Sequence, residues 1–323
     1  MNRTFSDGCN AQAFSANGVS LAQAVVDRTL RLGQALAMAD SSSPPILRGL
    51  SDIAGDYDAV ICDVWGVLHN GREAFLPAAD AMRRFRKERG PVVLLSNAPR
   101  LADGVEGLFD RVGLPRDFYD GIMTSGLAAR EDLVRRTERS GTLPLFYLGP
   151  PRDNPLFEGL NISLTRPEDA EVVLCTGFYD DETETPEDYR AMLETFKARA
   201  LPFLCANPDI VVQRGDKLIF CAGAIARLYE AIGGETVYYG KPYPAVFEKS
   251  LEKLRKIAKA ARPLVIGDGI ETDIAGAGRM GLDALFIAGG IHAGELRADP
   301  QSLARLFAKS GVDAVGAMPV LHW

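Results

Sequence analysis

The chain has 323 residues, of which 47% are hydrophobic and 24% are charged. This balance is typical of a globular protein with a large core and excludes a disordered or fibrous chain. The formal net charge is −7, and no run of like charges resembles a nucleic-acid-binding arm, so neither nucleic acid nor an anionic membrane is an expected partner.

The five cysteines are scattered without a CxxC pair. This spacing favours reduced, buried thiols over a disulfide framework or a zinc site. The N-terminal segment contains no apolar stretch of the signal-peptide type, and no window reaches the roughly 18 consecutive apolar residues of a membrane span. We therefore expect a cytoplasmic protein.

The first 45 residues are predicted to form an extension with one helix and a linker. Leu21, Val25, Leu32 and Leu36 fall on one side of a helical wheel, which indicates an amphipathic helix. The following SSSPP segment, residues 41–45, has the composition of a linker.

After the linker, short apolar runs alternate with helical patterns. The runs occupy residues 57–63, 91–97, 144–149, 170–177, 201–207, 236–240, 262–268 and 282–289. They are rich in Val, Ile and Leu and do not alternate with polar residues, which is typical of parallel strands covered on both faces. One helix start is well marked, because Thr185 can cap it and Pro186 suits its first position. The pattern predicts a doubly wound α/β fold.

Polar residues follow several of these runs. Asp63 ends the first run, Ser96 and Asn97 end the second, and Lys241 follows the run that ends at Tyr239 and Gly240. Ligands of doubly wound sheets bind beyond the carboxyl ends of the strands. Taken singly, each of these residues is most simply a turn former, a helix cap or a surface charge. Their occurrence together in one chain favours a functional site.

The run at 262–268 ends in Asp268, and Asp273 follows near the start of the next helix. Several carboxylates at one sheet edge repel each other unless a hard cation joins them, and oxygen-only ligation is typical of Mg²⁺. A phosphate would also need donors, which Ser96 and Lys241 can supply.

The order of these motifs resembles the haloacid dehalogenase (HAD) superfamily of hydrolases. Asp63-x-x-Gly66 resembles motif I, Ser96-Asn97 motif II, Lys241-Pro242 motif III, and Asp268 with Asp273 motif IV. The resemblance implies that Asp63 is the nucleophile and that Lys241 assists it. It also implies a phosphate site at Ser96, Asn97 and Lys241. Mg²⁺ would be held by Asp63, the backbone carbonyl of Trp65, Asp268 and Asp273.

The long segment between motifs II and III indicates an inserted domain. We expect a HAD-like core over 46–141 and 221–323, and a smaller α/β cap over 142–220. Asn207 and Asp209 resemble the ANPD segment in the caps of class IIA members, the NagD-like and pyridoxal-phosphate-phosphatase-like group. The expected partner is a small phosphorylated substrate. Because caps of this class often pair, a homodimer through the cap is also an expectation.

Trp65 departs from the family pattern. In HAD phosphatases, the residue two positions after the nucleophile is normally a second aspartate, which protonates the leaving oxygen. An indole has no proton to transfer near neutral pH, so it cannot be a general acid. The backbone carbonyl at this position can still bind a metal. His69 is the candidate substitute acid, although a histidine on a surface hairpin is the simpler interpretation.

Trp65 leaves two alternatives to a Mg²⁺-dependent phosphohydrolase that forms an aspartyl-phosphate. One is a non-catalytic phosphate-ligand binding protein of the same fold, which would keep every anion and metal ligand. The other is a metal-free dehalogenase, because dehalogenases of the superfamily carry an aromatic residue at this position. Asp268 and Asp273 disfavour the dehalogenase, since without a metal they would repel a haloacid carboxylate.

Overall fold

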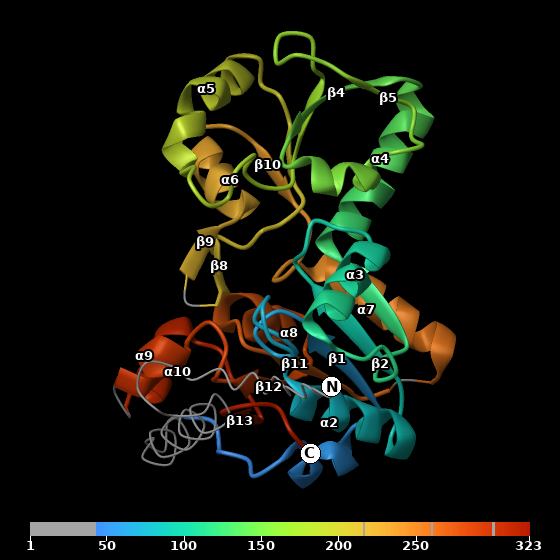
Figure 1. Cartoon of the computed structure of the whole chain (residues 1–323), viewed down its shortest axis with the longest axis vertical. Coiled ribbons are helices and arrows are strands. Elements are labelled where there is room, and N and C mark those ends of the chain that lie inside the picture. Colours follow the sequence, from blue (N-terminus) through green and yellow to red (C-terminus); the bar gives the residue numbers. More distant parts are fainter. Residues whose placement is uncertain (1–42, 216, 260, 299–300) are drawn as a thin grey trace, which may run out of the picture.

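The computed structural model describes residues 43–323 except 216, 260, 299 and 300. Within these residues the chain forms two parallel β-sheets, one above the other in Figure 1, and a separate hairpin. Helices flank both sheets, which confirms the predicted α/β class. The predicted N-terminal helix over 21–36 lies outside the described residues. No helix in the described part of the chain is long and apolar enough to cross a membrane.

The larger sheet has the strand order β13-β12-β11-β1-β2-β3. Its strands are β1 (Ala59–Asp63), β2 (Val92–Ser96), β3 (Gly121–Thr124), β11 (Pro263–Gly267), β12 (Asp283–Ile287) and β13 (Gly316–Met318). Strands β2 and β3 follow β1 in the chain and lie on one side of it. Strand β11, which comes much later in the chain, pairs with β1 on its other side. The boundary between β1 and β11 is therefore a switch point, where ligands of open α/β sheets bind.

Alternate residues of the larger sheet supply two cores. Val60 and Cys62 of β1 belong to the core beneath α2 (Leu76–Glu88) and α3 (Ala102–Val112). Ile61 faces the opposite way, into the core formed with α7 (Pro244–Ile257), α8 (Ala275–Arg279) and α10 (Ser302–Ser310). Because both faces are covered, every residue of β1 is buried, which is why this strand reads as a continuous apolar run.

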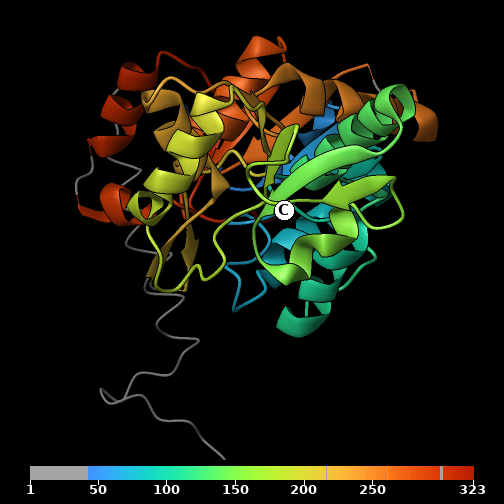
Figure 2. The ribbon, with the colours of Figure 1, turned by 90° about the horizontal axis from the view of Figure 1, so that it is seen from above.

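The smaller sheet has the order β10-β7-β6-β4-β5 and is the cap. Its strands are β4 (Leu143–Leu148), β5 (Ile162–Leu164), β6 (Val172–Cys175), β7 (Phe203–Cys205) and β10 (Thr236–Tyr238). Seen from above, this unit lies over the larger one (Figure 2). Its two cores are completed by α5 (Arg190–Ala198) and α6 (Ala222–Ala231) on one face and by α4 (Ser125–Ser140) on the other.

The cap draws on more of the chain than the 142–220 expected from the sequence. Helix α4 (Ser125–Ser140) precedes the expected start, yet its Ala129 and Leu133 pack into a cap core. Strand β10 follows the expected end, yet it pairs with β7. The run at 236–240 falls within the predicted core segment, 221–323. Which sheet a strand joins depends on its partners, and a local pattern does not reveal them.

An antiparallel hairpin, here called the cap hairpin, stands apart from both sheets. It consists of β8 (Val211–Arg214) and β9 (Lys217–Phe220). In Figure 1 it lies between the smaller sheet and the larger one. The sequence did not predict this hairpin or the short strands β3, β5 and β13, because strands this short carry little periodic signal.

The predicted helix start at Thr185 is confirmed. The backbone N–H of Thr185 donates to Asp188 Oδ2 at 2.7 Å, as in a capping box. The helices are α2, α3, α4, α5 (Arg190–Ala198), α6 (Ala222–Ala231), α7 (Pro244–Ile257), α8 (Ala275–Arg279), α9 (Ala293–Ala298) and α10 (Ser302–Ser310). Shorter helical turns are η1 (Leu50–Asp52), η2 (Ala54–Asp56), η3 (Pro151–Leu156), η4 (Pro186–Tyr189) and η5 (Ile270–Ile274).

Candidate active site

The site residues predicted from the sequence all line one cleft of about 1340 Å³, to which the core and the cap both contribute. They are Asp63, Trp65, His69, Ser96, Asn97, Asn207, Asp209, Lys241, Asp268 and Asp273. Residues far apart in the chain meet here because the carboxyl ends of parallel strands share one edge of the sheet.

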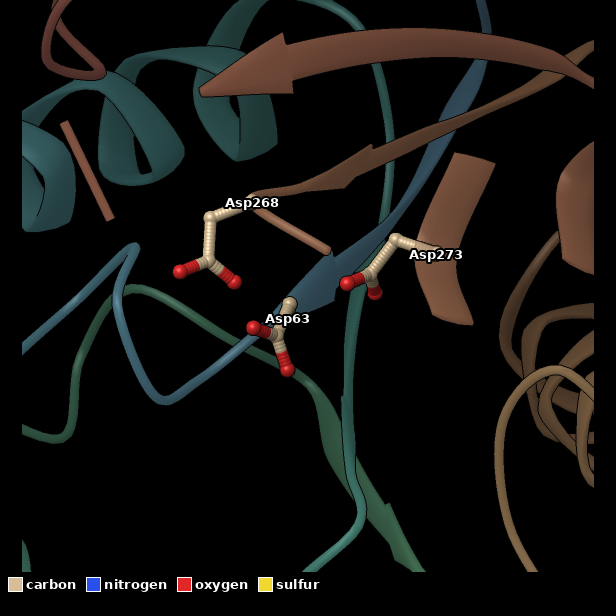
Figure 3. A group of neighbouring side chains, drawn as sticks. All are labelled: Asp63, Asp268 and Asp273. Carbon is tan, nitrogen blue, oxygen red and sulfur yellow. The ribbon is translucent and has the colours of Figure 1, made fainter. Parts of the chain in front are cut away.

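Three carboxylates meet at this edge. Among the described residues, Asp63, Asp268 and Asp273 each offer an oxygen, and these oxygens lie within 4.8 Å of one another. Figure 3 shows the three side chains coming together from separate segments. Gly66 makes room for Asp268, because a Cβ at this residue would lie 2.0 Å from Asp268 Oδ2 and its φ is +87°. A glycine here is therefore required by the site itself.

Lys241 is paired with two of these carboxylates. Its Nζ donates to Asp63 Oδ1 and, at 2.8 Å, to Asp273 Oδ1. Burial lowers the pKa of a lysine, but the charges of Asp273 and Asp63 outweigh burial and raise the pKa of Lys241 above its usual value. Lys241 is therefore an ammonium ion, and it places one positive charge among three acidic groups.

Burial is the main cause of the pKa shifts of Asp63 and Asp268. It raises the pKa of Asp63 well above the usual range, Lys241 opposes this effect, and the Asp273 charge adds to it. Burial, followed by the Asp273 charge, raises the pKa of Asp268 to about 7. Burial and mutual repulsion therefore disfavour the charged form of these carboxyl groups, and a divalent cation among them would favour it.

Ser96 ends β2 and is buried at the cleft. Its Oγ accepts a hydrogen bond from the backbone N–H of Ala98 at 3.1 Å. A hydroxyl that accepts in this way keeps its own O–H to donate, so Ser96 is suited to an anion in the cleft.

Asn97 is placed differently from the expected phosphate ligand. Its Nδ2 donates to Asp209 Oδ1 at 2.8 Å and to the Lys241 carbonyl oxygen at 3.2 Å. Its Oδ1 accepts from the Lys241 backbone N–H at 2.7 Å and from Ser125 Oγ at 3.3 Å. Because both amide hydrogens are engaged within the described residues, the Asn97 side chain positions the Lys241 segment and has no hydrogen left to donate to a phosphate.

The cap residues Asn207 and Asp209 form a turn that contacts the core. Asn207 Oδ1 accepts from the Asp209 backbone N–H at 3.1 Å, as in an Asx turn. Asp209 then reaches Asn97, as expected for a cap residue that faces the core. Burial raises the pKa of Asp209, and the hydrogen bond from Asn97 opposes this shift.

His69 is not suited to the role of substitute acid. Its side chain is only 1% exposed, and its Nδ1 accepts from the Gly71 backbone N–H at 3.0 Å. Burial lowers its pKa to about 4, so the ring is neutral at physiological pH and is a weak proton donor. The sequence suggested an exposed hairpin histidine, but the flap folds this ring inward, where it faces Trp65 and Phe109.

Three ion pairs that line the cleft were not predicted from the sequence. Arg100 Nε donates to the buried Asp153 Oδ1 at 3.0 Å, which joins the segment after β2 to the cap. Asp181 pairs with Arg152 at 2.8 Å and with Arg214 at 2.9 Å. Arg100 lies four residues after Ser96, and this position close to motif II could have marked it as a site residue. Asp153, its partner 53 residues away, has no comparable signal in the sequence.

Comparison with known proteins identifies the family that the motifs resemble. A family model described as haloacid dehalogenase-like hydrolase matches residues 60–163, and a HAD-hydrolase-like model matches residues 238–311. The two matches cover motifs I and II and motifs III and IV respectively. The cap strands β6 and β7 and the cap hairpin lie between the two matches, as expected for an insertion.

The relatives agree over most of the chain. Ribonucleotide monophosphatase NagD of Escherichia coli is 27% identical over 236 residues, which cover 72% of this chain and 88% of NagD. Bovine chronophin is 27% identical over 271 residues, 76% of this chain and 86% of chronophin. A crystal structure of a haloacid dehalogenase-like hydrolase from Brucella suis is 39% identical, with a TM-score of 0.76 over 85% of this chain and 100% of that one. The chain therefore belongs to the haloacid dehalogenase-like hydrolases, in their class IIA.

Proposed function

We propose that the protein is a Mg²⁺-dependent phosphatase that hydrolyses a small phosphorylated metabolite through an aspartyl-phosphate on Asp63. The observation that carries this proposal is the position of Asp63 at the switch point of the sheet, paired with Lys241 and beside Asp268 and Asp273. Two relatives, the ribonucleotide monophosphatase NagD and a D-glycerol 3-phosphate phosphatase of Mycobacterium tuberculosis, support a phosphate ester as substrate.

The donor set suits Mg²⁺. All the candidate side-chain ligands are carboxylates, and all three are buried, which matches the preference of Mg²⁺ for hard oxygen ligands. Asp63, Asp268 and the backbone carbonyl of Trp65 would hold the ion, and Asp273 would act through water. When bound, the ion neutralises the charge between an anionic nucleophile and an anionic substrate.

The residues of the chain then have separate roles. An Asp63 oxygen attacks phosphorus in line with the leaving oxygen, so that an O–P bond to Asp63 forms as the bond to the leaving group breaks. Lys241 and Ser96 bind the oxygens of the transferred phosphoryl group. Water then hydrolyses the aspartyl-phosphate, which releases phosphate and restores the Asp63 carboxylate. The cap covers the cleft and excludes bulk water.

The leaving group receives no proton from residue 65, because Trp65 has none to give. His69 does not replace it, since the neutral ring is a weak acid. The leaving oxygen must therefore depart with little assistance, and we propose that acyl and aryl phosphates react fastest, because a carboxylate and a phenolate are good leaving groups.

The test is a screen of phosphorylated metabolites and of p-nitrophenyl phosphate with the full-length protein, with and without Mg²⁺. Release of phosphate that requires Mg²⁺ and stops on chelation supports the proposal. Full activity after chelation would contradict the metal requirement. Absence of turnover on every ester, together with Mg²⁺-dependent binding of inorganic phosphate, would instead favour the binding protein.

Asp268→Ala is expected to weaken Mg²⁺ binding more than Asp273→Ala does. Asp273 already accepts from Lys241 Nζ and, at 3.1 Å, from the Gly269 backbone N–H, so it is suited to a water-mediated contact. Loss of such an outer contact typically costs about 10- to 100-fold in metal affinity, and loss of a direct ligand costs more. The measurement is the Mg²⁺ concentration at half-maximal activity, with the exposed Asp313→Ala as control. An equal or reversed order would contradict the assignment.

A further inference from the structure

Trp65, the residue that departs from the family pattern, makes a direct contact with the cap. Its indole Nε1 donates to the backbone carbonyl oxygen of Gln213 at 2.8 Å. Gln213 lies in β8, 148 residues further along the chain. Trp65 lies two residues after Asp63, so this hydrogen bond connects the immediate surroundings of the proposed nucleophile to the cap hairpin.

The flap, residues 65–74, holds the indole in this direction. The Gly66 backbone N–H donates to the His69 carbonyl oxygen at 2.8 Å, which closes the turn. The His69 ring stands edge-on to the indole with centroids 5.1 Å apart. A Cβ on Gly71 would lie 2.6 Å from Trp65 Cη2, and φ at Gly71 is +82°. The ring is thus enclosed on two sides, which explains the burial of His69 as packing against Trp65.

The cap hairpin needs such a contact. It has two strands and pairs with neither of the larger sheets, and an isolated two-stranded hairpin is marginally stable in water. Its strand β9 is exposed except for Ile219. The flap meets it a second time, because the Gly215 backbone N–H donates to the Asn70 carbonyl oxygen at 3.4 Å.

Further contacts join the same edge of the core to the cap. Asn97 Nδ2 donates to Asp209 Oδ1 just before the hairpin, and Arg100 contacts Asp153 elsewhere in the cap. Both core residues follow β2, whereas Trp65 follows β1. The flap is therefore the part of the core that holds the hairpin over the cleft.

We propose that Trp65 is a positioning residue that fastens the cap hairpin to the flap and so keeps the cap closed over the cleft. Where its relatives are expected to carry an acid, this chain carries a hydrogen-bond donor directed at its own cap. The effect of this contact on substrate affinity rests on the proposed function, but the contact itself does not.

The test is hydrogen–deuterium exchange on the full-length protein, comparing wild type with Trp65→Phe. Phenylalanine keeps an aromatic ring but removes the N–H, so we expect exchange in 208–220 to rise about two- to tenfold, the factor that one net hydrogen bond is worth. Exchange in β1 and β11 should not change. Trp323→Phe is the matched control, because it removes the chain's other indole, which packs on a core cluster of the larger sheet.

Unchanged exchange in the hairpin of Trp65→Phe would overturn the proposal, and so would an equal rise in β1 and β11, which would show general destabilisation. If Trp65→Phe does not fold, Gly71→Ala displaces the indole without removing it and should show the same local rise. A second readout is hydrolysis of p-nitrophenyl phosphate, for which Trp65→Phe should raise KM several-fold, by a larger factor than it lowers kcat. If no variant hydrolyses the ester, the proposed function fails while the exchange experiment still decides the role of Trp65.

Discussion

Asp63→Asn is expected to abolish phosphate release, with a loss of about 10⁴-fold or more in kcat, while the fold remains intact. The amide keeps the size of the carboxylate but is not a nucleophile towards phosphorus. The change also removes one of three neighbouring buried acids, which lowers the repulsion at the sheet edge, and it replaces the buried ion pair with Lys241 by a hydrogen bond to a neutral amide. Because these two effects oppose each other, stability without metal should change little. The measurements are single-turnover phosphate release and thermal unfolding in the presence of a chelator.

Asp313→Asn, at an exposed position, is the control for loss of an aspartate and should behave as wild type. A well-folded Asp63→Asn protein that still releases phosphate at a rate near that of wild type would contradict the role of Asp63. Mass spectrometry of the wild type, quenched in acid during turnover, should detect a phosphoryl group on the peptide that contains Asp63. This adduct should be absent from the variant.

Trp65→Asp is expected to increase kcat on alkyl phosphates far more than on aryl phosphates. A general acid contributes roughly 10²–10⁴-fold, and its contribution is largest where the leaving group is a strong base. Wild type, which lacks this acid, should cleave an aryl ester much faster than glycerol phosphate. The introduced carboxyl should reduce this difference.

The replacement also removes the indole and its hydrogen bond to Gln213, and it leaves a space in the flap. Trp65→Asn is the matched control, because it has the same size and loses the same contacts but has no acid. The ratio of kcat for Trp65→Asp to that for Trp65→Asn should reach about 10²-fold on alkyl esters and stay near one on aryl esters. Equal rates for the two variants on glycerol phosphate would show that a carboxyl at this position does not reach the leaving oxygen.

Much of the site could be predicted before the fold was known. Asp63, Ser96 and Asp268 each stand at or just after the end of an apolar run, and the structure places these runs as neighbouring strands β1, β2 and β11. The prediction holds because parallel strands in an α/β sheet end at the same edge, whatever their separation in the chain. The type of residue at a strand end and the order of the motifs are local properties that the sequence displays directly.

The contacts between core and cap could not be predicted in this way. Strand β10 joins the cap sheet although it immediately precedes a core motif, and the cap hairpin carries no long-range signal of its own. Asn97 was expected to bind phosphate, but its amide is occupied by Asp209 and Lys241. Pairings of this kind depend on which surfaces meet after the chain has folded.

Trp65 illustrates the difference between what the sequence determines and what only the tertiary structure determines. The sequence alone establishes that residue 65 is no acid, since the chemistry of an indole does not depend on its surroundings. It could not show that the indole would hydrogen-bond to the carbonyl oxygen of Gln213 or that His69 would be enclosed beside it. The tertiary structure decided both, because the direction of a side chain and the desolvation of its neighbour depend on the packing of the flap against the cap.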